Sequence, residues 1–176
     1  MCSEAALRLL ERSEGLSNIL VIDLGLCTGC RNCELACSQK HTSTFNPRRS
    51  RIQVLKDESR NVILPLVCLH CEVPLCAGAC PTSAIIKDDA GTLVVDTKKC
   101  VGCSDCVTAC VYGGVVLDPM TQRAIKCDLC SGDPACVKAC QYGAITMLPR
   151  ELRGLRGRYE GTKRVLQSYL LIEEGT

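Results

Sequence analysis

Short apolar runs separated by polar turns recur along the chain and predict small β-hairpins. The three predicted hairpins join residues 51–55 to 61–64, 84–86 to 92–95, and 115–117 to 123–125. Their turns consist mainly of polar residues, with a glycine or a proline in two of them, and such residues favour tight reversals. Two further apolar stretches, 20–23 and 144–147, predict single short strands.

Helical periodicity is weak and confined to short segments. Residues 1–18 predict a short helix with Ser3 as a candidate N-cap, and residues 34–37 predict one helical turn. After Pro149 the chain becomes basic, and a terminal helix would have an apolar side made by Val165, Leu166, Tyr169 and Leu170. This tail is either a strap packed on the protein or an arm for a partner. The elements together predict an α+β fold of short hairpins and short helices.

The composition leaves little material for an ordinary hydrophobic core. The 176 residues include one Phe, four Tyr and no Trp, but seventeen Cys. A cysteine content of about a tenth indicates either a disulfide scaffold or a metalloprotein. Because small domains with few large apolar groups are often stabilised by metal, we expect bound metal to form part of the core and the apoprotein to be largely unfolded.

Charge and hydropathy exclude several classes of protein. The formal net charge of +2 provides no strong field for nucleic acid. No apolar run of about 18 residues predicts a membrane-spanning helix. Residues 1–8 resemble neither a signal peptide nor a twin-arginine signal, so we expect a cytoplasmic protein whose thiols stay reduced. A local basic group, Arg48, Arg49 and Arg51, is interpreted as a solvated loop rather than a docking patch.

Sixteen of the seventeen cysteines fall into four closely spaced runs. These are Cys27, Cys30, Cys33 and Cys37 (motif one); Cys68, Cys71, Cys76 and Cys80 (motif two); Cys100, Cys103, Cys106 and Cys110 (motif three); and Cys127, Cys130, Cys136 and Cys140 (motif four). Motifs one and three have the spacing C-x2-C-x2-C-x3-C, which is typical of bacterial-type ferredoxins, where cysteine thiolates bind an iron–sulfur cluster. Short apolar strands follow the last three motifs, which predicts an internal repeat of loop, helical turn and strand.

Two such units would make a ferredoxin-like module with two clusters, and four would make two modules. Motifs two and three are separated by only nineteen residues, so we expect them to form an inner module, residues 67–117. Motifs one and four would then form an outer module from residues 1–66 and 118–148, with residues 149–176 as a C-terminal extension. Pairing in sequence order, motif one with two and three with four, is the alternative.

In two-cluster ferredoxins the fourth cysteine of each run binds the other cluster. The expected ligand sets are therefore Cys27, Cys30, Cys33 and Cys140 (cluster 1); Cys68, Cys71, Cys76 and Cys110 (cluster 2); Cys100, Cys103, Cys106 and Cys80 (cluster 3); and Cys127, Cys130, Cys136 and Cys37 (cluster 4). Each motif cysteine is used once, and Cys2 is expected to be an unliganded thiol. His41 is expected to be a hydrogen-bond donor near a cluster or a surface histidine, not a ligand.

Zinc and disulfides explain the pattern less well than iron and sulfur. Structural zinc usually takes two separated C-x2-C pairs for each ion, whereas here three cysteines crowd together and a fourth follows closely, four times over. A disulfide scaffold does not fit a chain without an export signal.

No sequence feature predicts catalysis. The chain contains no nucleophile–base pair, P-loop or dinucleotide fingerprint, and four thiolates for each cluster would leave no iron open to substrate. The favoured function is the relay of single electrons through four 4Fe-4S clusters. An enzyme subunit that shares a substrate pocket and a scaffold that delivers clusters are the alternatives. We expect Arg31, Lys99 and Lys126, which lie beside the motifs, to tune the cluster potentials.

The four-motif arrangement over about residues 20–148 resembles the polyferredoxin subunits of molybdenum and tungsten oxidoreductases, including formate dehydrogenase and dimethyl sulfoxide reductase. The resemblance implies the pairing of motif one with four and two with three. It also implies four 4Fe-4S clusters, because no cysteine position is replaced. In its compactness the chain looks most similar to the small iron–sulfur subunit of tungsten-containing aldehyde oxidoreductases.

The same resemblance implies a catalytic partner with a molybdenum or tungsten pterin. A flavin- or NAD-linked subunit or a soluble ferredoxin would serve the other end of the relay, and self-association would lengthen it. The alternatives are a free-standing polyferredoxin or an iron–sulfur subunit of a hydrogenase, formate dehydrogenase or aromatic acyl-CoA reductase complex.

Overall fold

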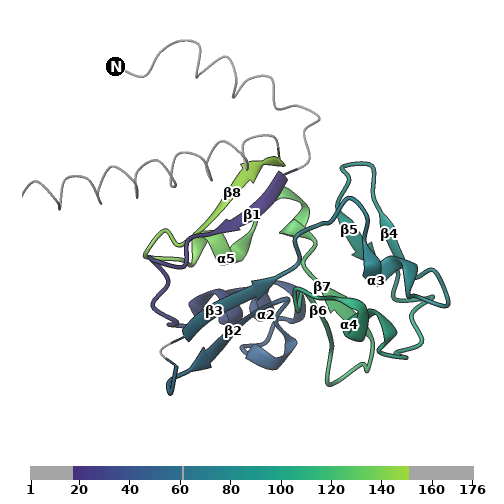
Figure 1. Cartoon of the computed structure of the whole chain (residues 1–176), viewed down its shortest axis with the longest axis horizontal. Coiled ribbons are helices and arrows are strands. Elements are labelled where there is room, and N and C mark those ends of the chain that lie inside the picture. Colours follow the sequence, from purple (N-terminus) through teal and green to yellow (C-terminus); the bar gives the residue numbers. More distant parts are fainter. Residues whose placement is uncertain (1–17, 61, 151–176) are drawn as a thin grey trace, which may run out of the picture.

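The computed structural model describes residues 18–60 and 62–150 (Figure 1). Apart from Asn18, the helix expected over residues 1–18 lies outside these residues, as do Cys2, the basic segment after Arg150 and the expected terminal helix. Within the described part, no helix is both long and apolar enough to cross a membrane.

The described chain is a small mixed structure of short strands and short helices. The strands are β1 (Asn18–Ile22), β2 (Ile52–Asp57), β3 (Val62–Val67), β4 (Ile85–Lys87), β5 (Leu93–Val95), β6 (Val115–Leu117), β7 (Ala124–Lys126) and β8 (Ile145–Pro149). The helices are α2 (Asn32–Thr42), α3 (Leu75–Gly78), α4 (Asp105–Ala109) and α5 (Ala135–Lys138), with two 3-10 turns, η1 (Pro47–Arg49) and η2 (Leu129–Gly132).

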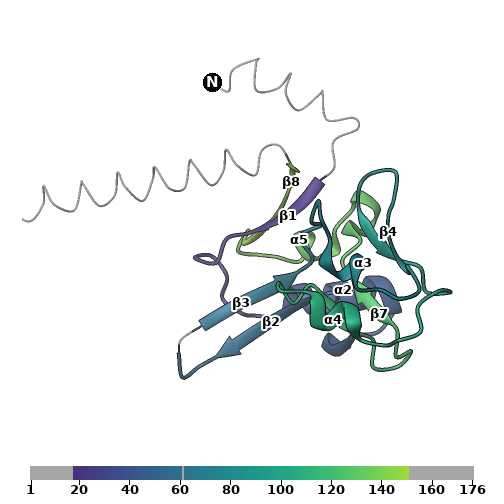
Figure 2. The same cartoon turned by 45° about the vertical axis from the view of Figure 1, so that its right-hand side comes forward.

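All three predicted hairpins are confirmed as two-stranded antiparallel sheets: β2 with β3, β4 with β5, and β6 with β7. In the longest, Ile52 lies opposite Val67 and Asp57 opposite Val62, so both strands continue beyond the predicted ranges. This hairpin extends from the body of the molecule, whereas β4 and β5 lie at another end (Figures 1 and 2).

The fourth sheet joins the two isolated strands, a pairing that the sequence analysis did not predict. Strand β1 pairs antiparallel with β8, from Asn18 opposite Pro149 to Ile22 opposite Ile145. Each strand alone is five residues of unremarkable pattern, and more than a hundred residues separate them. Their pairing brings the segment before motif one beside the segment after motif four.

The helices also pack in pairs that join motif one to motif four and motif two to motif three. Helix α2 of motif one packs against α5 of motif four, and α3 of motif two packs against α4 of motif three. Helix α2 is eleven residues long, far more than the single turn predicted, because its register continues past Cys37 to Thr42. Helices α3 and α5 are both four residues long and both begin after a proline, Pro74 and Pro134, which cannot donate to a preceding turn.

Cysteines form much of the interior. One cluster of buried residues contains Cys33, Cys37, Cys68, Cys127 and Cys136 among aliphatic side chains from β1, β2, β3 and β8. A second contains Cys76 and Cys106 with Ile85, Leu93 and Val115. Inward-facing thiols thus take the place of large apolar side chains. The first group contains cysteines of α2 and α5, and the second contains cysteines of α3 and α4.

Strand β2 is attached to motif one through the backbone of Val54. The Val54 N–H donates to Glu34 Oε1 at 2.6 Å, and the Val54 carbonyl accepts from Arg31 Nη2 at 3.4 Å. Glu34 is only 4% exposed, so its carboxylate is a buried acceptor that satisfies a strand donor. This contact holds the start of α2 against the hairpin.

We expect Glu34→Ala to lower the free energy of unfolding of the iron-loaded protein by about 1–3 kcal/mol, because the buried Val54 N–H loses its acceptor. The measurement is anaerobic denaturant unfolding. Gln39→Ala, at an exposed position of the same helix, is the matched control. Equal unfolding midpoints for the two variants would contradict this account.

Candidate iron–sulfur centres

All sixteen motif cysteines lie in the described part of the chain and carry free thiols. Each motif places its first cysteines in a loop and its later ones on or beside a short helix. Residues in the left-handed region open these loops: Gly29 and Arg31 in motif one, and Gly102 and Ser104 in motif three. A left-handed residue turns the chain back sharply, so that successive thiols point into one space.

One small cavity is lined by Cys80, Cys100, Cys103 and Cys106. Three of these cysteines come from motif three and the fourth from motif two. The pKa of Cys106 is raised to about 11, mainly by burial and in part by the charges of Cys100, Cys103 and Cys80. The cavity therefore gathers the four thiols expected for cluster 3.

A second small cavity is lined by Cys37, Cys127, Cys130 and Cys136, together with His41 and Arg51. Here motif four supplies three cysteines and motif one supplies Cys37. Burial raises the pKa of Cys136 to about 12, with additional effects from Cys37 and Cys130. These are the four thiols expected for cluster 4.

The other two expected sets are brought together in part. The pKa of Cys76 is raised mainly by burial, and the charges of Cys68 and Cys110 raise it as well. Burial likewise raises the pKa of Cys33 to about 12, with effects from Cys30 and Cys27. Cys140 packs against the buried group that contains Cys33.

Backbone N–H groups point at several of the thiols. The N–H of Ala84 donates to Cys80 Sγ at 3.2 Å, that of Gly114 to Cys110 Sγ at 3.3 Å, and that of Arg51 to Cys37 Sγ at 3.3 Å. The N–H groups of His70, Ala124 and Leu129 reach the sulfur atoms of Cys68, Cys100 and Cys127 at 3.4 Å. Such bonds stabilise thiolates and raise the reduction potential of a cluster that the thiolates bind.

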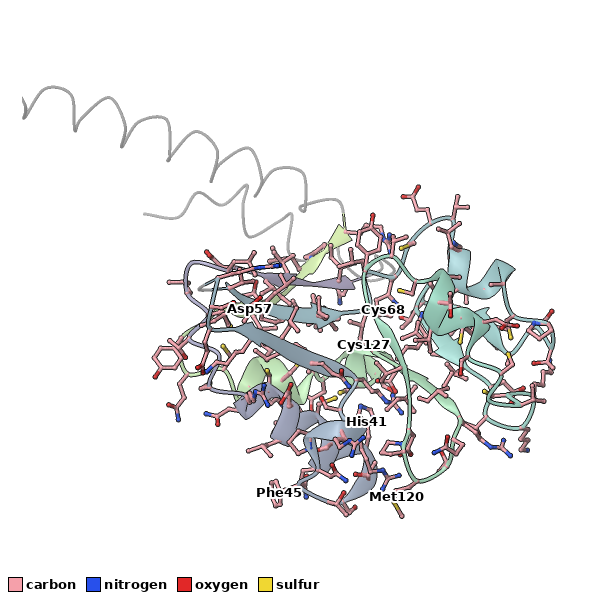
Figure 3. The ribbon with its side chains drawn as sticks, turned by 60° about the horizontal axis from the view of Figure 1, so that its bottom comes forward. His41, Phe45, Asp57, Cys68, Met120 and Cys127 are labelled. Atoms are coloured by element: carbon pink, nitrogen blue, oxygen red, sulfur yellow. The ribbon has the colours of Figure 1, made fainter. Side chains whose placement is uncertain are left out.

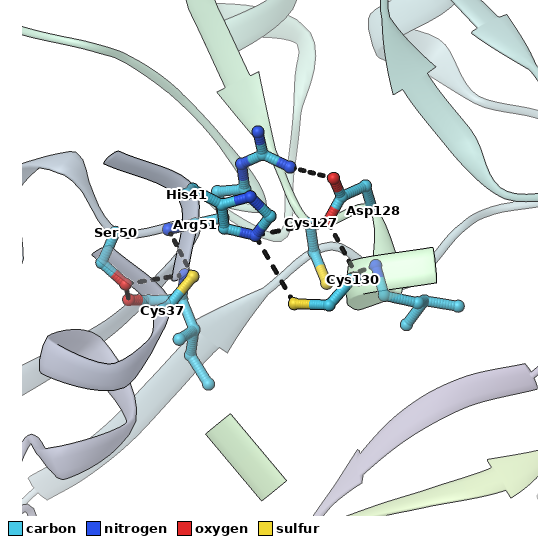
Figure 4. A network of polar contacts seen from close by, with 9 residues as sticks. Cys37, His41, Ser50, Arg51, Cys127, Asp128 and Cys130 are labelled. Carbon is cyan, nitrogen blue, oxygen red and sulfur yellow. Dashed lines mark hydrogen bonds and ion pairs between the residues drawn. The ribbon is translucent and has the colours of Figure 1, made fainter. Parts of the chain in front are cut away.

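His41 lies inside the protein beside the second cavity, at the centre of a polar network (Figure 4). Its Nε2 is 3.5 Å from Cys130 Sγ and 3.4 Å from Asp128 Oδ1, and Arg51 forms an ion pair with Asp128. Burial lowers the pKa of His41, which favours the neutral ring. The structure thus places His41 beside a thiol, and its role as a hydrogen-bond donor near a cluster stays a prediction.

The interpretation of the arginine group as a solvated loop is wrong for two of its three members. Arg49 donates to both carboxylate oxygens of Asp118 at 2.8–2.9 Å, and Arg51 pairs with Asp128. Arg48 alone is exposed. Because Asp118 follows β6, the Arg49 contact connects the segment after motif one to the β6–β7 hairpin. The guanidinium lowers the pKa of Asp118 through these hydrogen bonds.

Three side-chain atoms in the described part are buried without a hydrogen-bond partner: Glu34 Oε2, His70 Nε2 and Lys126 Nζ. An unpaired ammonium inside a protein is strongly unfavourable unless an anion lies near it. A 4Fe-4S core bound by four thiolates is such an anion. The convergent thiols, the backbone donors and the buried ammonium therefore fit iron–sulfur clusters.

Comparisons with known proteins agree with this chemistry. Residues 59–150 match the family model of a 4Fe-4S dicluster domain. Among curated relatives, a subunit of tetrathionate reductase from Salmonella typhimurium is 38% identical over 106 residues, covering 55% of this chain and 42% of the relative. A polyferredoxin-like subunit of aliphatic sulfonate oxidoreductase from Pyrococcus furiosus is 40% identical over 82 residues, covering 46% and 47%.

A third relative, a subunit of sulfite dehydrogenase from Allochromatium vinosum, is 36% identical over 107 residues, covering 49% of this chain and 45% of the relative. The chain thus spans about half the length of the curated relatives it matches. A solved structure of the active site complex BamBC of benzoyl coenzyme A reductase is 26% identical with a TM-score of 0.48, covering 86% of this chain and 90% of that one.

The cysteine arrangement defines an iron–sulfur protein. Because the family model covers more than half of the residues, the chain belongs to the 4Fe-4S dicluster domain family. The relatives named above are subunits of oxidoreductases.

Gly114 allows close contact between the β6–β7 hairpin and motif two. A Cβ at this position would lie 2.6 Å from Cys68 Cα and 2.8 Å from Cys68 N. We expect Gly114→Ala to push the Cys68 backbone away, lower the free energy of unfolding by about 1–3 kcal/mol and reduce the bound iron.

Iron analysis and anaerobic unfolding measure both effects. Gly78→Ala is the control, because a Cβ there meets nothing within 4 Å. Full iron content and unchanged stability in Gly114→Ala would show that the contact is unimportant.

Proposed function

We propose that this chain is a non-catalytic electron-transfer subunit that passes single electrons through four 4Fe-4S clusters. The observation that carries the proposal is the convergence of thiols from different motifs: Cys80 beside the first three cysteines of motif three, and Cys37 beside those of motif four. Iron–sulfur clusters need such sets, and a row of clusters needs no substrate pocket.

The proposed ligands are those expected from the sequence. Cluster 1 is held by Cys27, Cys30, Cys33 and Cys140; cluster 2 by Cys68, Cys71, Cys76 and Cys110; cluster 3 by Cys100, Cys103, Cys106 and Cys80; and cluster 4 by Cys127, Cys130, Cys136 and Cys37. The packing of α2 on α5 and of α3 on α4 supports this exchange of fourth cysteines, and so does the β1–β8 sheet. It also supports the division into an inner and an outer module.

Contacts between the modules suggest the order of the relay. Burial raises the pKa of Cys127, and the charge of Cys68 contributes, so these residues of clusters 4 and 2 are neighbours (Figure 3). Both belong to the same buried cluster of side chains. The proposed order is therefore cluster 3, cluster 2, cluster 4, cluster 1.

Exposure of the thiols supports the same order. Within the described part, Cys30 and Cys103 are the exposed cysteines, and they belong to clusters 1 and 3, the two ends of the proposed row. A relay needs access to donor and acceptor at its ends and protection in its middle, so this distribution suits electron entry at one end and exit at the other.

The proposed partner is a catalytic subunit with a molybdenum or tungsten pterin. The resemblance to polyferredoxin subunits and the relatives named as reductase and dehydrogenase subunits support this partner. The narrower likeness to tungsten aldehyde oxidoreductases rests on compactness. A hydrogenase or formate dehydrogenase complex is the second candidate, favoured by 34% identity over 91 residues to formate hydrogenlyase subunit 2 of Escherichia coli.

Anaerobic co-purification from the native organism tests the partner. We expect the chain to carry iron with a larger subunit that contains molybdenum or tungsten, as measured by metal analysis and mass spectrometry. Recovery of a stable, iron-loaded chain with no partner would favour a free-standing polyferredoxin. Recovery with a nickel-containing subunit would favour the hydrogenase alternative.

Cysteine-to-serine variants test the ligand exchange. We expect Cys140→Ser to change the same electron paramagnetic resonance signal as Cys30→Ser, because both residues would hold cluster 1. Under pairing in sequence order, Cys140→Ser would instead reproduce the defect of Cys103→Ser. Cys2→Ser, outside all four sets, is the control and should leave every signal unchanged.

A further inference from the structure

Lys126 is a buried lysine without a hydrogen-bond partner. The residue is 2% exposed, and its ammonium nitrogen contacts no acceptor. None of the ion pairs between described residues involves it. A lysine in a solvated strand would extend its charge into water, so the burial of this ammonium requires a compensating anion.

The position of Lys126 indicates where that anion lies. Lys126 is the last residue of β7, opposite Val115 in β6, and it directly precedes Cys127. Gly114, next to Val115, fits closely against the backbone of Cys68. Lys126 therefore occupies the junction between the β6–β7 hairpin, the start of motif two and the start of motif four.

The packing of the β6–β7 hairpin places Lys126 beside the proposed ligands of cluster 2. Val115, opposite Lys126, and Ala124, two residues before it, belong to a buried group of side chains that contains Cys76. Cys110 packs against the same group. Directly opposed residues of an antiparallel pair, and residues two apart in a strand, extend their side chains to the same face of the sheet. The Lys126 side chain therefore lies on the face that meets Cys76 and Cys110.

We infer that Lys126 is the fixed countercharge of the cluster bound by Cys68, Cys71, Cys76 and Cys110, and that it raises the reduction potential of this cluster above that of an otherwise identical site. The inference rests on the proposed function, since it assumes that these cysteines hold a cluster. Lys126 is a positioning residue: it acts through the charge of the cluster and binds no iron.

The physical reason is the charge of the two redox states. Reduction adds one electron, supplied by the external reductant, so the reduced cluster is more negative than the oxidised one. A nearby cation stabilises the more negative state more strongly, and low dielectric inside the protein enlarges the difference. In the proposed order, cluster 2 lies inside the row, where Lys126 would favour the arrival of electrons from either neighbour.

The test is an anaerobic redox titration of the full, iron-loaded chain with dithionite, followed by electron paramagnetic resonance. We compare Lys126→Met, which removes the charge and keeps an unbranched side chain, with Lys126→Arg, which keeps the charge. Lys98→Met is the matched control, because Lys98 is exposed in the turn before motif three.

We expect Lys126→Met to weaken the reduction of one cluster roughly tenfold, which corresponds to about 59 mV for a one-electron couple. The shifted signal should be the one that Cys71→Ser alters. Lys126→Arg and Lys98→Met should titrate like the unmodified chain. Unchanged potentials in Lys126→Met, or equal shifts in the Met and Arg variants, would overturn the inference.

Loss of a cluster is also informative. If Lys126→Met loses the iron of one cluster and Lys126→Arg retains it, the positive charge is required at this site and the inference stands. If both variants lose it, side-chain shape and not charge is responsible, and the inference fails. If the unmodified chain binds fewer than four reversible clusters, it is the proposed function that fails, independently of Lys126.

Discussion

Inward-facing thiols are the constraint on which the structure depends. A chain with one Phe and no Trp has few side chains large enough to fill an interior, and here cysteines from three motifs share a buried cluster with leucine, isoleucine and valine. Within the described part, two small cavities are each lined by four cysteines that come from two different motifs. Iron and sulfide bound in such spaces would complete the packing and join segments distant in sequence.

Buried charge follows from the same constraint. An ordinary core of this size would exclude a lysine ammonium and a glutamate carboxylate, yet Lys126 and Glu34 are both almost fully buried. Glu34 is stabilised by the Val54 N–H, whereas Lys126 has no partner in the described part of the protein. An interior built around anionic clusters would accommodate such a cation, and the cation would raise the reduction potential of a cluster beside it.

The proposed inner and outer modules meet in the buried group of side chains that contains Cys68 and Cys127. Cys68 of motif two lies in the buried group of side chains formed mainly by motifs one and four. Separately, Arg49 pairs with Asp118 and so connects the segment after motif one to the residue that follows β6. Cys68 and Cys127 share this buried group, which would shorten the distance between the proposed clusters 2 and 4. In the proposed order, the exposed Cys30 and Cys103 would lie at the two ends of the relay.

Sequence alone was sufficient to determine the local chemistry and the short hairpins. Cysteine spacing encodes a loop that gathers three thiols, and the polar turns at residues 58–60, 88–92 and 118–123 reverse the chain between neighbouring strands, so both depend on residues close together. The β1–β8 sheet, the extent of α2, the ion pair of Arg49 and the burial of Lys126 were decided by tertiary structure. Each depends on contacts between segments that are distant in sequence. The residue types of a strand do not show which distant segment will pack against it. A lysine after a strand has the same sequence signal whether it faces water or a cluster.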